Sequence, residues 1–164
     1  MNNSILKLTP STEQQSIINY IINKQHVIGD AVAGSGKSTL VLALAQSTEK
    51  KILQLTYNKL LKMEVETKAK KYDIHNIEIH TYHSLGVKYY NKEAHDDITL
   101  NEIIEEDTKV KNELPDFDII VIDEAQDMSR LYYNFVRKVK QDIIKHSTSN
   151  ITLLILGDRY QEMY

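Results

Sequence analysis

The sequence contains no cysteine, which excludes a disulfide scaffold, a thiolate metal site and a thiol nucleophile. It also lacks a long apolar run. Apolar stretches such as residues 119–122 and 153–156 have only four residues, and no stretch approaches the length of a membrane span, so no transmembrane helix is expected. The first ten residues contain neither a basic segment nor an apolar segment of the kind that a secretory signal needs. These absences predict an intracellular protein of the cytoplasm or nucleoid that is not secreted and has no membrane partner.

The net charge of −3 excludes a protein that binds nucleic acid through a basic surface overall. The charges are unevenly distributed, however. Residues 50–71 contain seven lysines and two acids, whereas residues 93–107 contain seven acids and neither lysine nor arginine. Such asymmetry permits a local phosphate-binding face on an acidic protein, although either run by itself is typical of a solvated helix face.

The length of 164 residues and the hydrophobic content of 41% are typical of a single folded domain. Short β-rich runs alternate with amphipathic stretches. Strands are expected at 26–31, 51–56, 77–80, 118–123 and 151–157. Helices are expected after a capping box at Ser11 and Gln14, and at 37–47, 59–71, 84–91, 99–114 and 129–145. The alternation predicts an α/β fold with an open parallel sheet and helices on both faces, and ligands bind such sheets at the carboxyl ends of the strands.

Residues 31–38, AVAGSGKS, match the phosphate-binding loop pattern, with alanine at the first glycine position. The two glycines allow backbone N–H groups to point at phosphate oxygens, and the helix that follows adds its N-terminal dipole. Lys37 is expected to reach the β- and γ-phosphates of ATP, and the Ser38 hydroxyl to bind Mg²⁺. The residues expected to bind the nucleotide here are Ala33, Gly34, Ser35, Gly36, Lys37, Ser38 and Thr39. The alternative is a chance glycine-rich turn.

The stretch IIVIDEAQD, residues 119–127, places two adjacent acids at the end of an apolar strand. Asp123 is expected to hold Mg²⁺, which prefers carboxylate and water oxygens. Glu124 is expected to accept a proton from the attacking water. Adjacent residues of an extended chain point to different sides, so one acid can face the metal and the other the water. The alternative is a solvated acidic loop.

DEAQD, together with AVAGSGKS, resembles the UvrD/Rep-like branch of superfamily 1 DNA helicases. Four further segments agree with that family, in its order. They are STEQ at 11–14, LTYNK at 55–59, TYHSL at 81–85 and GDRYQ at 157–161, which resemble the Q motif, motif Ia, the TFHS motif and motif III. Motif Ia is one residue shorter than the common form, and tyrosine replaces phenylalanine in TFHS. The resemblance identifies residues 1–164 as one domain, the first RecA-like, ATP-binding domain with the P-loop NTPase fold.

The resemblance implies a role for each matched residue. Gln14 would select adenine, and Gln126 would couple the nucleotide site to DNA. Catalysis would depend on Lys37, Glu124 and Gln161, and the metal would be held by Ser38 and Asp123. Single-stranded DNA would contact Tyr57, Asn58, Lys59, Thr81, Tyr82, His83 and Tyr164. The alternatives are that Gln14 only caps a helix, that Gln161 is an exposed terminal residue, and that the tyrosines are packing aromatics.

The sequence departs from the family after motif III. Family members have a second RecA-like domain, which carries an arginine finger, and a larger insertion where this sequence has only the short acidic stretch 86–116. An arginine finger contributes about 10³ to 10⁵ in rate. We therefore expect this chain alone to bind ATP, to hydrolyse it weakly and to bind single-stranded DNA weakly, with a second RecA-like domain as a partner in cis or in trans. The alternative is a non-catalytic nucleotide- or DNA-binding remnant or regulatory module.

Overall fold

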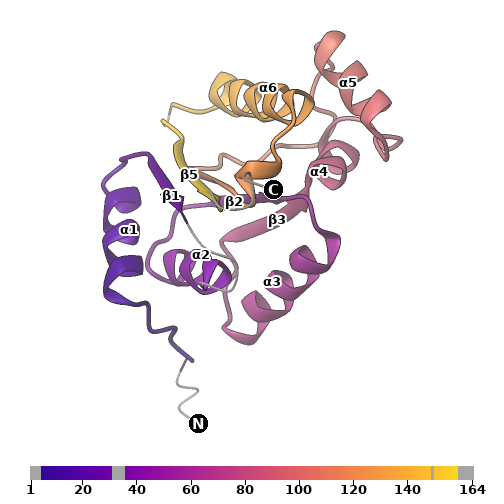
Figure 1. The fold of residues 1–164 in the computed structure, drawn as a ribbon. Coiled ribbons are helices and arrows are strands. Elements are labelled where there is room, and N and C mark those ends of the chain that lie inside the picture. Colours follow the sequence, from indigo (N-terminus) through magenta and orange to yellow (C-terminus); the bar gives the residue numbers. More distant parts are fainter. Residues whose placement is uncertain (1–4, 31–35, 149, 159–164) are drawn as a thin grey trace.

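The structure is a computed structural model that describes residues 5–30, 36–148 and 150–158. It is an α/β domain in which helices surround a central sheet (Figure 1). The strands are β1 (Val27–Asp30), β2 (Ile52–Thr56), β3 (Ile77–Thr81), β4 (Ile119–Ile122) and β5 (Thr152–Gly157). The helices are α1 (Thr12–Ile22), α2 (Lys37–Gln46), α3 (Lys59–Lys71), α4 (Tyr82–Tyr89), α5 (Asp97–Glu105) and α6 (Arg130–His146), and one 3₁₀ turn, η1, covers Ala125–Asp127.

The sheet has the strand order β1-β5-β4-β2-β3, and all four pairings are parallel. This confirms the open parallel sheet predicted from the sequence. Every residue of β4 is buried because the strand has neighbours on both sides and helices over both faces. The register aligns Ile122 of β4 with Leu55 of β2 and Ile155 of β5. The carboxyl ends of these strands therefore meet at one edge of the sheet.

Two hydrophobic layers hold the helices to the sheet, one on each face. Helices α1, α2 and α3 cover one face, and α4 and α6 lie on the other, with α5 packed against α4 and α6 at the periphery (Figure 1). Leu44 of α2 and Ile52 of β2 are fully buried in the first layer, and Leu85 of α4 and Phe135 of α6 are fully buried in the second. Each buried side chain of this size contributes about 1.5–3 kcal/mol relative to an exposed one. The two layers fix the helices that position the site.

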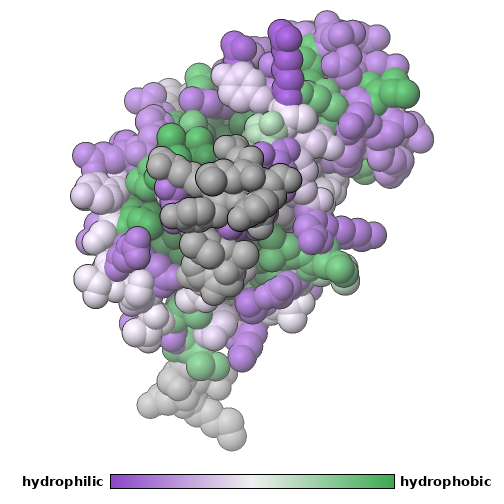
Figure 2. Space-filling view, in the orientation of Figure 1, coloured by the Kyte–Doolittle hydropathy of each residue, from purple (hydrophilic) through white to green (hydrophobic). Residues whose placement is uncertain are grey.

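The acidic stretch that follows α4 differs from its prediction. The helix expected at 99–114 is instead α5, which begins after the N-cap Asp96 and ends at Glu105. Asp107 then takes a left-handed conformation with φ of 45°, and its carboxylate accepts a 2.7 Å hydrogen bond from the buried Lys138 of α6. The chain afterwards turns back toward α4, where the Lys111 N–H donates to the Tyr89 carbonyl at 2.8 Å. The surface over α5 is mainly hydrophilic (Figure 2).

The predicted start of α4 is also corrected. The helix begins at Tyr82 rather than Ser84, because the Thr81 and Ser84 side chains form a capping box. The capping box predicted at Ser11 and Gln14 is present at the start of α1. Among the helices that the structure describes, none is both long enough and apolar enough to cross a membrane.

Candidate functional site

The site begins where α2 follows β1. Gly36 precedes α2 and has φ of 82° and ψ of 29°, a left-handed conformation that favours glycine. A Cβ at this position would lie 3.1 Å from the Gln14 Nε2, so the local packing also favours glycine. No described side chain caps the amino end of α2, where Lys37, Ser38 and Thr39 are partly exposed. This helix end suits an anion. Ala33, Gly34 and Ser35 lie outside the described residues.

Lys37 meets two carboxylates at the carboxyl end of β4. Its Nζ lies 2.5 Å from the Glu124 Oε1 and 3.7 Å from the Asp123 Oδ1. Asp123 is only 2% exposed and accepts a 2.9 Å hydrogen bond from the Glu124 N–H. The end of the predicted phosphate loop and the predicted acid pair therefore lie at one point, although they are far apart in the sequence.

The backbone at Glu124 is strained. Its φ of 52° and ψ of 47° place it in the left-handed region, which costs a residue other than glycine about 1–3 kcal/mol. The other described non-glycine residues with positive φ are Lys24, Asp73 and Asp107, and each directly follows a helix C-cap, where this conformation is common. Glu124 instead follows a strand. Strain of this kind gathers at functional sites, because the surroundings must hold the residue in place.

The environment shifts the pKa values of the two acids in opposite directions. Burial raises the pKa of the Asp123 carboxyl, and the nearby Lys37 opposes this only in part. Burial also acts to raise the pKa of Glu124, but the hydrogen bonds from Lys37 and Gln126 outweigh it and lower that pKa. Neighbouring titratable groups whose pKa values move apart are typical of acid–base sites.

Gln126 links Glu124 to the end of β5. Its Nε2 donates to the Glu124 Oε2 at 2.5 Å, and its Oε1 accepts from the Asp158 N–H at 3.1 Å. A Cβ on Gly157 would lie 3.2 Å from the Gln126 Oε1, so glycine makes room for this approach. Asp158 is buried. A continuous series of contacts thus runs from Lys37 through Glu124 and Gln126 to the segment that contains GDRYQ.

A cavity of about 320 Å³ lies beside Lys37, between the start of α1 and the carboxyl end of β1. Its walls combine apolar side chains with polar ones. It is lined by Ser11, Glu13, Gln14, Ile17, Gly29, Asp30, Gly36, Lys37, Leu40 and Leu156. The Gln14 side chain already has two partners, since its Oε1 accepts from the Ser11 N–H at 2.9 Å and its Nε2 donates to the Gly36 carbonyl at 3.2 Å. The capping contact of Gln14 is therefore present.

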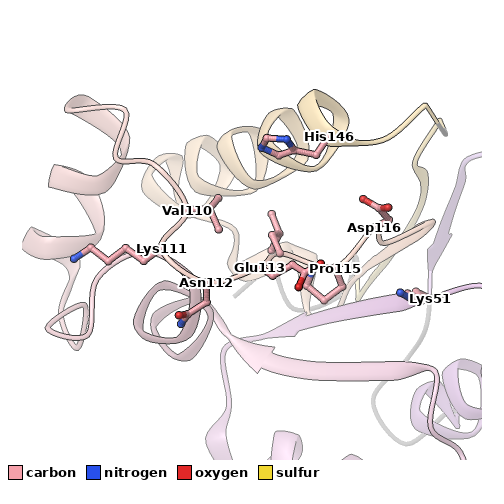
Figure 3. A pocket seen from close by; sticks show the side chains of 9 residues that line it. Lys51, Val110, Lys111, Asn112, Glu113, Pro115, Asp116 and His146 are labelled. Atoms are coloured by element: carbon pink, nitrogen blue, oxygen red, sulfur yellow. The ribbon is translucent and has the colours of Figure 1, made fainter.

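A larger cavity, of about 750 Å³, lies at the opposite edge of the sheet. It is bounded by Lys51, which precedes β2, by the loop from Val110 to Asp116, and by His146 at the end of α6 (Figure 3). The labelled charged side chains do not converge, and Lys51 and Lys111 lie at opposite ends of the view (Figure 3). The site chemistry is therefore placed at the smaller cavity, beside Lys37.

Of the residues expected to contact DNA, those that the structure describes lie at or shortly after the ends of β2 and β3, at the same carboxyl edge. Asn58 caps the amino end of α3 by accepting from the Leu60 N–H at 2.8 Å, and Thr81 caps α4 by accepting from the Ser84 N–H at 3.1 Å. Lys59, the first residue of α3, is exposed. His83 is partly exposed, and its Nε2 lies 2.8 Å from the Asp97 Oδ1. Two helix amino ends and an exposed lysine therefore share this edge.

The tyrosines that were expected to contact DNA differ in their exposure to solvent. The Tyr82 side chain is only 1% exposed and its ring stacks on Tyr132, with centroids 4.4 Å apart. In this structure Tyr82 is therefore a packing aromatic, which is the alternative that the sequence left open, and its contact with DNA stays a prediction. Tyr57 is partly exposed, and its hydroxyl donates to the Asp127 carbonyl. Gln161 and Tyr164 lie outside the described residues.

Comparisons with known proteins extend this picture. Residues 14–164 match a family model described as an AAA domain. The chain belongs to this AAA domain family. Together with the fold, this confirms the resemblance to the first RecA-like domain of a superfamily 1 helicase. The search of curated proteins found no match.

Solved helicase structures share the fold of this AAA domain. One is a Pif1 helicase structure concerned with DNA unwinding at forked double-stranded DNA, with 16% identity and a TM-score of 0.57. The match covers 92% of this chain and 33% of the Pif1 chain. The UvsW helicase from bacteriophage T4 has 10% identity and a TM-score of 0.55. The match covers 94% of this chain and 54% of the UvsW chain. The structure of Pif1 from Bacteroides sp., in complex with ADP-AlF4, has a TM-score of 0.53 and 18% identity. The match covers 92% of this chain and 32% of the Pif1 chain. This AAA domain thus spans a third to about half of these helicase chains.

Sequence reasoning missed several residues of the site. Tyr132 and Asp97 meet beside the residues expected to contact DNA, where the Tyr132 hydroxyl donates to the Asp97 Oδ1 at 3.0 Å, and no motif marks either residue. Asp158 lies within GDRYQ, so the motif offered a signal for its contact with Gln126. The capping roles of Asn58 and Thr81 also had a signal, because each residue precedes a helix and is of a type that favours the N-cap.

Proposed function

We propose that this AAA domain is the ATP-binding core of an ATP-dependent DNA helicase. The observation that carries the proposal is the meeting of Lys37 with Asp123 and Glu124, at 3.7 and 2.5 Å, at the carboxyl edge of a parallel sheet. Alone, the domain binds Mg·ATP and hydrolyses it slowly. Within a larger protein, hydrolysis drives movement along single-stranded DNA.

The residues beside Lys37 suit the phosphates of ATP and a magnesium ion. Lys37 supplies a positive charge next to the amino end of α2, where anions are stabilised. The Asp123 carboxylate and the Ser38 hydroxyl offer oxygen ligands, which magnesium prefers. Thr39, on the same first turn of α2, adds a further hydroxyl. Bound magnesium would neutralise phosphate charge, and these side chains would hold it.

Glu124 is the proposed general base. In this structure its carboxylate is paired with Lys37 and oriented by Gln126. When ATP phosphates take over the Lys37 ammonium, the Glu124 carboxylate loses that partner and becomes free to accept a proton from water. The residue with this left-handed backbone carries its carboxylate next to Lys37, the residue proposed to hold the phosphates.

The adenine base is proposed to occupy the cavity beside Lys37. Ile17 and Leu40 offer apolar contact to the base, and the Gln14 amide offers one donor and one acceptor to its edge. Because the Gln14 amide now contacts Ser11 and Gly36, base recognition requires it to exchange at least one of these contacts. This exchange lowers the affinity gained from Gln14.

Single-stranded DNA is proposed to bind at the carboxyl edge, where Tyr57, Asn58, Lys59, Thr81 and His83 lie. The exposed Lys59 and the amino ends of α3 and α4 attract backbone phosphates. The protein is net negative, so the affinity is weak, about tens of micromolar or weaker, and falls steeply with salt. Little sequence preference is expected, because phosphate contacts carry no base information.

The test is the rate of ATP turnover with and without single-stranded oligo-dT, compared between the wild-type protein and Lys37→Ala. We expect slow turnover that DNA stimulates in the wild type, and none in the variant. Nucleotide binding without any turnover would instead assign the domain to the non-catalytic module class. The absence of both binding and turnover would refute the proposal.

A further inference from the structure

Three tyrosine rings form a cluster between the DNA edge and the loop that contains Glu124. Tyr57 follows β2, Tyr82 begins α4 and Tyr132 lies in the first turn of α6. The ring centroids are 5.1 Å apart for Tyr57 and Tyr82, 4.4 Å for Tyr82 and Tyr132, and 5.2 Å for Tyr57 and Tyr132. The tyrosine cluster therefore packs together three elements that are distant in the sequence.

The hydroxyl groups of the tyrosine cluster point to two different segments. The Tyr57 hydroxyl donates to the Asp127 carbonyl, and the Tyr82 hydroxyl lies 4.0 Å from the Met128 sulfur. Both of these partners belong to the short stretch that follows Glu124. The Tyr132 hydroxyl instead donates to Asp97, on the side of α5. Tyr57 and Tyr82 thus contact the nucleotide-site loop, and Tyr132 contacts the acidic insertion.

Tyr57 is placed between the two proposed ligand sites. The next residues along the chain, Asn58 and Lys59, begin α3 at the proposed DNA edge. In the other direction, the Asp127 carbonyl that accepts from the Tyr57 hydroxyl is three residues from Glu124. The intervening 3₁₀ turn is only three residues long, and its N-cap, Glu124, is strained. Backbone strain persists only where the surroundings hold it, and the hydrogen bond from the Tyr57 hydroxyl is one of the contacts that hold this turn.

We infer that Tyr57 is a positioning residue that couples DNA binding to nucleotide binding, through the hydrogen bond from its hydroxyl to the Asp127 carbonyl. DNA held at Asn58 and Lys59 fixes the Tyr57 backbone, and its hydroxyl fixes the loop that contains Glu124. Coupling of this kind is reciprocal, so each ligand changes the affinity of the other by one common factor. The inference rests on the proposed function, since it needs both ligands to bind.

The test measures that coupling factor. Fluorescence anisotropy gives the Kd for labelled oligo-dT without nucleotide and with a saturating, slowly hydrolysed ATP analogue and Mg²⁺. In the wild type we expect the two Kd values to differ by about fivefold or more. Tyr57→Phe keeps the ring packing and removes only the hydroxyl, so the ratio should fall below twofold. A direct DNA contact of Tyr57 would change both Kd values equally and leave the ratio unchanged.

Tyr132→Phe is the matched control, because it removes a hydroxyl from the same cluster on the side away from Asp127. It should keep the wild-type coupling factor. If both ligands bind and Tyr57→Phe keeps the full factor, or if the wild type shows no coupling, the inference is wrong while the proposed function stands. If the wild type binds neither ATP analogue nor oligo-dT, the proposed function fails and the inference fails with it.

Discussion

Replacement of Glu124 by glutamine should tighten ATP binding. In the structure, the Glu124 carboxylate holds the Lys37 ammonium at 2.5 Å, and this contact competes with the phosphates for the same lysine. The side chains are 11% and 25% exposed, so solvent weakens the ion pair, and we assign it about 1 kcal/mol. Removal of the negative charge also relieves repulsion between the carboxylate and the phosphates. Together these effects amount to about 1–2 kcal/mol, or roughly a five- to thirtyfold lower Kd.

Isothermal titration calorimetry with Mg·ATP measures this effect directly. Glu113→Gln provides a matched control, since it makes the same change of charge at the cavity on the opposite edge of the sheet. Its Kd should equal that of the wild type. The reasoning about Lys37 would be refuted if Glu124→Gln bound ATP as weakly as the wild type or more weakly. In the same variant the residual turnover should disappear, because an amide cannot accept the proton.

Two further predictions concern pH and DNA. The hydrogen bond from His80, with those from Tyr89 and Lys88, lowers the pKa of Glu78 from 4.5 to about 2. Its stabilising contribution is therefore complete above pH 4.5 and is lost as the pH falls toward 2. The carboxylate is 31% exposed, which reduces this contribution to about 1–2 kcal/mol. Urea unfolding should therefore show a lower free energy of unfolding for Glu78→Gln than for the wild type at pH 7. The difference between the two should become smaller below pH 4.5, and a difference that does not change with pH would contradict this role of Glu78. For DNA, Lys59→Ala should weaken oligo-dT binding for every sequence and reduce the slope of log K against log salt by about 0.7. Lys71→Ala, at the other end of α3, should change neither the affinity nor the salt slope. Equal effects of the two substitutions would contradict the proposal that DNA binds at the carboxyl edge of the sheet.

The sequence predicted the fold well, because the relevant signals are local. The four apolar residues of β4 predict a strand buried on both faces, and the alternation of strands and helices predicts a parallel sheet. The convergence of Lys37 with Asp123 and Glu124 also followed from local patterns, since a glycine-rich turn and an acid pair both follow strands that end at one edge. The roles assigned to these residues stay predictions.

The features that the sequence did not predict depend on contacts between distant segments. The burial of Tyr82 is caused by Tyr57 and Tyr132, and no local pattern indicates that these rings meet. Just beyond the early end of α5, Asp107 accepts a hydrogen bond from Lys138 on another helix, and no local pattern indicates this contact. The left-handed backbone of Glu124 likewise reflects its surroundings, because residue type alone disfavours it.

The most direct test of the account is the melting temperature of the protein with and without Mg·ATP, for the wild type and Lys37→Ala. A ligand present at 100 times its Kd stabilises the folded state by about 2.7 kcal/mol. For a domain of this size the melting temperature should then rise by roughly 5–10 °C. Lys37→Ala should melt near the wild type without ligand and show no comparable rise, whereas Lys140→Ala, on α6, should respond as the wild type does. A rise of equal size in Lys37→Ala would contradict the assignment of Lys37 as the phosphate-binding residue, and with it the account of the site.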